Sequence, residues 1–333
     1  MNSSGTVTPG IWVPNGETWE GYNASNPMPA SRTPGEAGSP FNKLIGSPVL
    51  LGNSAAMIAF MLADKLEGAP MPAKCGLPNK VGHPTVFASN SDPVVEIIVT
   101  EKWGGNYEAL NKKKIHVPAR AEASSPTDQH LEIVLAPADA IVPGETAEMW
   151  VAQSVISGKL QCATGGYGNI TKSLLEGSAD AANFDLSAGQ IRASELVAGS
   201  IKHALVVSVK NTKATHVYPA SSSDGVSENA NAPAMGQRIY IAYTKAEIEA
   251  LTVKPWLKTV LQALREYGAY VTDTGNYTMQ FQMEGSEMFT SFGQPEPFSA
   301  IAAAESLPTE GGNYNFIFET GVDWTKLRAI EHP

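Results

Sequence analysis

The stretches IKHALVVSV (residues 201–209) and YGAYVTDTGNYTMQFQMEG (residues 267–285) set the expected fold of this chain. The first stretch is apolar and rich in β-branched residues, which is typical of a strand. In the second, apolar and polar residues alternate from Tyr277 to Glu284, which is the two-residue period of a strand with one buried face. Both stretches therefore predict strands.

Two helices are expected between these strands. Thr244-Lys-Ala-Glu247 has the spacing of a capping box, and Pro255 suits the first turn of a second helix. An apolar stripe then continues to Tyr267 and ends before Gly268. Packing explains both helices, so we interpret them as structural.

Outward from this block, short strand-like segments dominate. Strands are expected over residues 94–103, 128–138, 146–155, 236–243 and 313–321, and further helices over residues 53–68, 194–197 and 297–306. The glycine-rich stretch LQCATGGYGNITKS (residues 160–173) lacks the spacing of a phosphate-binding loop. We interpret it as a turn or bulge.

Composition agrees with a β-rich chain. Of the 333 residues, 43% are hydrophobic and only 17% are charged, and glycine and proline are abundant. We therefore expect a mainly β fold, a β-sandwich or jelly-roll-like core with a few peripheral helices. Residues 1–40 are expected to form an extended N-terminal arm and residues 41–333 a single large β-rich domain. The arm is either a flexible leader or a docking segment that uses Trp12, Trp19 and Tyr22.

Charge and cysteine content exclude several classes of function. The net charge is −10, and the longest basic run is Lys112-Lys113-Lys114, so nucleic acid is not an expected partner. Cys75 and Cys162 lack zinc-ligand spacing, although one disulfide between them is possible. Neither a secretory signal nor an apolar run of membrane-spanning length is recognised, so we expect neither signal-directed export nor membrane insertion.

Several residues are candidates for contacting a polar ligand. Alternation places His130 on the face of its strand opposite Leu131. Glu148 and Trp150 share a face, an arrangement in which the indole can stack on a sugar while the carboxylate binds its hydroxyls. A solvent-facing Glu beside a half-buried Trp is the alternative.

The central block supplies the candidate catalytic residues. These are His203, His216, Asp224 and Asp273, together with Glu148. His203 shares its strand face with apolar residues, so a core histidine is the alternative there. The polar row of Gln280, Gln282 and Glu284 fits either a ligand groove or a solvated face. No cofactor is expected, because no calcium-binding motif is present; calcium near Asp224 or Asp273 is an open alternative.

A distributed set of motifs carries a resemblance. SPFNKLIG (39–46), HVYPASSSDG (216–225) and TVLQALREYGAYVTDTG (259–275) are among the segments, spread over residues 39–330, that resemble a group of large, poorly characterised bacterial proteins. Most of that group are exported by actinobacteria and myxobacteria, and the resemblance implies action on extracellular polysaccharide. Gln129 departs from the group, which often has Gly there. The positions that the resemblance singles out are Asp128, His130, His203, His216, Asp224 and Asp273.

These observations lead to a functional hypothesis. This chain resembles exported proteins, yet no export signal is recognised in it. Phage virion proteins leave the cell by lysis and need no such signal. We therefore expect a minor tail protein of a phage virion that binds or cleaves host cell-envelope polysaccharide. Its other partners would be virion proteins or itself, through the arm, and its location virion or extracellular. The alternatives are a secreted polysaccharide lyase or glycosidase, and a purely structural or receptor-binding tail component, so catalysis stays open.

Overall fold

The computed structural model describes residues 40–63, 73–75, 82–101, 107–124, 129–142, 144–169, 179–293, 297–310, 313–317 and 321–331. Four earlier expectations lie outside these ranges. They concern the N-terminal arm with Trp12, Trp19 and Tyr22, the helix end near Gly68, the singled-out Asp128, and the polar end of the glycine-rich stretch. Strands outnumber helices in the described ranges, so the expectation of a mainly β fold with few helices is confirmed.

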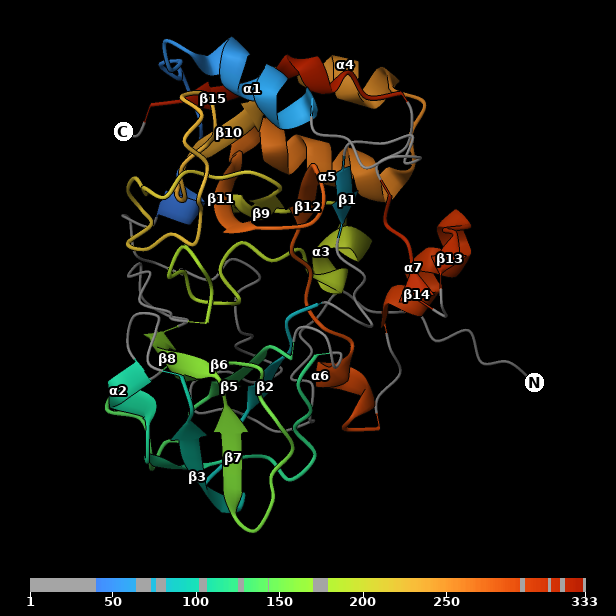
Figure 1. Cartoon of the computed structure of the whole chain (residues 1–333). Helices are drawn as coiled ribbons and strands as arrows, with labels where there is room; N and C mark the ends of the chain where they lie inside the picture. The colour runs from blue at the N-terminus through green and yellow to red at the C-terminus, as the bar shows by residue number, and fades with distance from the viewer. Residues whose placement is uncertain are drawn as a thin grey trace, which may run out of the picture.

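A six-stranded mixed sheet with its helices occupies one end of the molecule (Figure 1). Its strands, in spatial order, are β1 (Ala73–Cys75), β12 (Met279–Phe281), β9 (Leu205–Val209), β11 (Ala269–Thr274), β10 (Arg238–Ile241) and β15 (Leu327–Ile330). Strands β9 and β11 run parallel, so their carboxyl ends lie at the same edge of the sheet.

The helices beside this sheet form for the expected reasons. Helix α4 (Lys245–Ala250) begins with reciprocal hydrogen bonds between Thr244 and Glu247, so the capping box is confirmed. Helix α5 (Pro255–Glu266) has proline in its first turn and buries the apolar stripe against the sheet. Gly268 follows it with φ of 73°, a conformation that glycine adopts without strain.

Other helices flank the sheets. They are α1 (Ser54–Ala63), α2 (Tyr107–Leu110), α3 (Ala193–Ala198), α6 (Glu287–Thr290) and α7 (Pro297–Glu305), with 3-10 turns at Pro40–Asn42 and Trp324–Lys326. A two-stranded sheet of β13 (Thr309–Glu310) and β14 (Asn313–Tyr314) accompanies α7 in sequence. Several strands are shorter than expected. Strands β12 and β14, for example, cover only part of the segments in which apolar and polar residues alternate.

Two smaller mixed sheets form the other end of the molecule (Figure 1). One consists of β2 (Thr85–Phe87), β5 (Leu131–Val134), β6 (Glu145–Trp150) and β8 (Thr164–Asn169). The other consists of β4 (Lys114–His116), β3 (Val94–Val99) and β7 (Lys159–Cys162). Apolar side chains from both sheets belong to one core, which is separate from the core of the six-stranded sheet.

The glycine-rich stretch forms a strand, so its interpretation as a turn or bulge was wrong. Strand β8 pairs with β6 along its full length. A Cβ atom on Gly165 would lie 2.3 Å from the backbone oxygen of Glu148. The glycine is needed because the two backbones approach closely, not because the chain turns.

Cys162 is a free and buried thiol, so the possible disulfide with Cys75 is not formed. Burial raises the pKa of this thiol to about 12, which keeps it protonated and unreactive. Within the described ranges, no helix combines the length and the apolar character needed to cross a bilayer.

Replacing Gly165 with alanine should lower the free energy of unfolding by about 2 kcal/mol, because the added methyl group overlaps the β6 backbone. Urea unfolding followed by circular dichroism measures the change. Gly52→Ala is the matched control, since no atom lies within 4 Å of the position that its Cβ would take. Equal stability of the two variants would contradict the close-approach explanation.

Candidate functional site

The four-stranded sheet buries both of its faces. On one face, Leu131, Ile133 and Met149 belong to the apolar core shared with the three-stranded sheet. The alternating residues Glu132 and Glu148 point the other way, and both are 0% exposed. Burying carboxyl groups on a sheet face costs free energy unless hydrogen bonds or bound protons compensate, so the groups around Glu132 and Glu148 decide whether the arrangement is stable.

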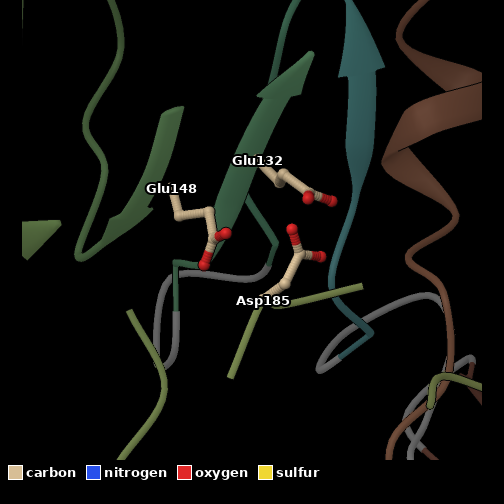
Figure 2. Close-up of side chains that lie close together, drawn as sticks. All are labelled: Glu132, Glu148 and Asp185. Carbon is tan, nitrogen blue, oxygen red and sulfur yellow. The ribbon is translucent and has the colours of Figure 1, made fainter. Parts of the chain in front are cut away.

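Three carboxyl groups meet on this face. Glu132 from β5 and Glu148 from β6 meet Asp185, which belongs to a segment that runs between the two ends of the molecule (residues 179–191, here called the connecting segment). One oxygen from each residue lies within 4.8 Å of the others, and Figure 2 shows the three groups turned toward one another. We call Glu132, Glu148 and Asp185 the acidic trio.

Hydrogen bonds within the chain hold the trio. Thr85 Oγ1 donates to Glu132 Oε2 at 2.5 Å, and Thr146 Oγ1 donates to Glu148 Oε1 at 3.2 Å. The backbone N–H of Leu186 donates to the other oxygen of Glu148, also at 3.2 Å. This last bond ties the connecting segment to the sheet.

Crowding determines the protonation of the trio. Burial, and then the neighbouring Asp185 and Glu132, hold the pKa of Glu148 well above its usual range. Like-charged groups at this separation in a buried site favour a neutral form of one of them. The trio offers only oxygen ligands, which is the donor set that calcium and magnesium prefer. Both oxygens of Glu148 and Oε2 of Glu132 also accept the internal hydrogen bonds described above.

Two buried histidines extend the polar face. His83 is 3% exposed and His130 is 6% exposed, and their ring centroids lie 4.0 Å apart. His130 therefore points away from the apolar core, as alternation predicted. It does not reach the surface, because the connecting segment and the chain around Glu284 cover this end of the sheet: His83 forms a backbone bridge with Glu284.

A second cluster lies at the carboxyl end of β11. The carboxyl groups of Asp224 and Asp273 are hydrogen-bonded to each other. Thr274 Oγ1 also donates to Asp224 Oδ1 at 2.6 Å, and Thr274 N donates to Asp273 Oδ1 at 2.7 Å. Asp224 is exposed and Asp273 half-buried, so solvent reaches the cluster. We call Asp224 and Asp273 the aspartate pair.

Backbone irregularities bring the pair together. The register between β9 and β11 shifts between Val271 and Asp273, and a shift of this kind re-aims the side chains that follow it. Gly225 follows Asp224, and a Cβ atom at this position would lie 2.1 Å from Lys213 O, so only glycine is accommodated there. The Asp-Gly sequence thus lets the loop press against the chain that follows β9.

Asp180 is a third carboxyl group close to the aspartate pair, and no sequence pattern had selected it. Its Oδ2 accepts a hydrogen bond from Thr272 Oγ1, and its Oδ1 accepts one from Ala182 N at 2.8 Å. Burial raises the pKa of Asp180 to about 6, against the opposing effects of these bonds and of nearby His130. The signal that could have found it is an Asp followed by small residues, which favours an Asx-turn.

Burial and the charges of Asp180 and Asp224 hold the pKa of Asp273 well above its usual range. The hydrogen bond from Asp273 to Asp224 acts in the same direction, because a carboxyl group must be protonated to donate. The aspartate pair is therefore a solvent-accessible group that keeps a proton to higher pH than a free aspartate does.

The other two candidate histidines do not join either cluster. His203 is 2% exposed, and its ring nitrogens lie 3.0 Å from Glu195 Oε1 and 2.9 Å from Ala204 O. The core interpretation of His203 fits this environment. His216 is exposed on the same loop as Asp224, and its backbone bridges to Met235.

The candidate ligand-binding residues are mostly enclosed. Gln282 is 8% exposed and Glu284 is 7% exposed, and Glu284 Oε1 accepts a hydrogen bond from Ala193 N at 2.8 Å. Gln280 and Trp150 are half-buried. The solvated-face interpretation was wrong for Gln282 and Glu284, because α3 and the connecting segment pack on this side. Glu148 is fully enclosed, so it does not offer a sugar the contact that was expected beside Trp150.

Glu148→Gln should weaken the pH dependence of stability. The folded state raises the pKa of Glu148, so the folded protein binds this proton more tightly than the unfolded chain does, and stability falls as pH rises above 4.5. Glutamine cannot ionise. Between about pH 5 and about pH 8 the variant should therefore lose at least about 1 kcal/mol less stability than the original chain.

Urea unfolding at both pH values measures this difference. Glu249→Gln, which removes an exposed carboxylate on α4, is the control and should keep the original slope. A Glu148→Gln slope equal to that of the control would show that Glu148 is ionised in the folded protein at neutral pH.

No family model, curated protein or solved structure matches this chain.

Proposed function

We propose that this chain is a tail-associated protein of a phage virion that binds and hydrolyses a neutral polysaccharide of the host cell envelope. The aspartate pair carries the proposal. It combines a proton-holding carboxyl group, a hydrogen-bonded partner and access to solvent at the carboxyl edge of a parallel strand pair. A carboxyl group with a raised pKa is the usual general acid for breaking a glycosidic bond.

The roles follow from the geometry of the carboxyl groups. Asp273 would donate its proton to the leaving oxygen, and Asp224 would hold that proton in position beforehand. A directly hydrogen-bonded pair is too close to supply both acid and base, because glycosidases separate these groups by roughly 5 to 9.5 Å. Asp180, which loses its proton above a pH of about 6, is the nearby carboxyl group that we assign as the base acting on water.

Charge supports a neutral substrate. The aspartate pair and Asp180 bring three carboxyl groups to one edge, on a chain with a net charge of −10. A uronate or phosphate group would be repelled there unless a cation intervened. Lyases act beside uronate carboxylates, so this site favours hydrolysis of an uncharged sugar over the lyase alternative.

The virion assignment and the finer fold assignment belong to this proposal. The first rests on the resemblance to exported proteins of actinobacteria and myxobacteria. The second, a β-sandwich of jelly-roll type, rests on the four-stranded and three-stranded sheets, which enclose one apolar core. In the proposal this unit is the scaffold, and the N-terminal arm contacts other virion proteins or a second copy.

One observation favours the non-catalytic alternative, a structural or receptor-binding tail component. Two of the three acids of the site also receive a hydroxyl hydrogen bond from their own chain, from Thr274 to Asp224 and from Thr272 to Asp180. Such bonds fasten loops to β11 even if no substrate is cleaved. An activity measurement separates the two roles.

Asp273→Asn should reduce hydrolysis by about 100-fold or more, because an amide cannot donate the acid proton. The assay incubates the protein with host cell-wall arabinogalactan and counts new reducing ends. Glu228→Gln, an exposed carboxylate on the loop that carries Asp224, is the matched control and should keep full activity.

Each other result has a defined meaning in this assay. Ultraviolet-absorbing unsaturated ends would identify a lyase and contradict the hydrolytic proposal. Tight binding without any product would identify the non-catalytic component. Full activity of Asp273→Asn would remove the aspartate pair from the mechanism.

A further inference from the structure

The loop between β9 and β10 (residues 210–237) exposes an aromatic ring. Tyr218 is 62% exposed, and among the described residues it is the one aromatic side chain in the set of strongly exposed large hydrophobics. Val226, on the same loop, is 85% exposed, and His216 is exposed as well. This loop also carries Asp224, and it lies at the left of Figure 1.

The backbone around Tyr218 is held in place. Val217 N donates to Met235 O at 2.8 Å, and Ala220 N closes a turn by donating to Val217 O at 3.0 Å. Pro219 and Ala220 are buried. The ring of Tyr218 is therefore presented to solvent from a fixed turn.

Short connections join this turn to the strand that carries Asp273. Ser221 N donates to Ala182 O at 3.1 Å, and Asn183 Nδ2 donates to Ser221 Oγ at 2.8 Å. Ala182 N donates to Thr272 O at 2.9 Å, one residue before Asp273. The turn, the Asp180 segment and the end of β11 thus form one hydrogen-bonded unit.

We propose that Tyr218 is the sugar-binding platform of this site, with the ring stacked on the C–H face of a neutral sugar unit next to the bond at the aspartate pair. This inference rests on the proposed function, because it assigns the group that holds the polysaccharide. An aromatic ring offers a large contact area to the apolar face of a sugar, and its hydroxyl can bind a sugar hydroxyl. A fixed backbone lowers the ordering cost of that contact.

The test measures binding separately from hydrolysis. Arabinogalactan oligosaccharides from the host wall are titrated by calorimetry into the Asp273→Asn variant, which holds the sugar without cleaving it. Adding Tyr218→Ala should weaken binding about tenfold. Adding Tyr218→Trp should keep the affinity, and the new indole fluorescence should shift to shorter wavelength as the sugar covers it.

Ile156→Ala, in the same Asp273→Asn background, is the matched control. Ile156 is 70% exposed beside β7, in the other end of the molecule, so its loss should leave the affinity unchanged. Equal affinities for Tyr218→Ala and the control would overturn the platform while leaving the proposed function intact. Absence of binding by Asp273→Asn with Tyr218 in place would overturn the proposed function and the platform with it.

Discussion

Carboxyl groups that crowd together away from water cannot all be ionised, and this constraint governs the region between the two ends of the molecule. The connecting segment supplies Asp185 to the acidic trio and Asp180 to the edge of β11. The backbone bond from Leu186 to Glu148 fixes it to the four-stranded sheet. The placement of the acids and the placement of the segment therefore depend on each other, and a proton retained by the trio is part of the fold.

The same physics has different consequences in the two clusters. Glu148 is fully enclosed, so its raised pKa bears on stability. Asp273 meets the exposed Asp224, so its raised pKa bears on the proposed acid chemistry. The register shift in β11 and the glycine after Asp224 create this exposed arrangement. The proposed catalytic acid and the proposed sugar platform both belong to one hydrogen-bonded unit.

Local patterns in the sequence predicted local structure well. The capping box at Thr244 and the proline that opens α5 are both present, and alternation placed His130 on the correct face. Which polar faces are covered depends on segments distant in sequence, so the burial of Glu148 and Glu284 was not foreseen. The glycines of β8 were misassigned as a turn because their role also depends on a distant segment: strand β6 approaches them closely.

The candidate site was predictable only in part. Asp224 and Asp273 were both among the candidate catalytic residues of the central block, and the structure brings them together. Asp180 was missed because its importance comes from Thr272 and the acids around it. His203 was selected for its residue type, yet Glu195 and a backbone carbonyl bind its ring nitrogens.

The most direct test of the central claim is a carbon-13 NMR titration of the aspartate carboxyl groups, with the Asp273 signal assigned by its loss in Asp273→Asn. Asp273 should keep its proton well above pH 3.8, and Asp180 should titrate at about 6. Titration of Asp273 near 3.8 would contradict the central claim that the aspartate pair holds a proton for catalysis.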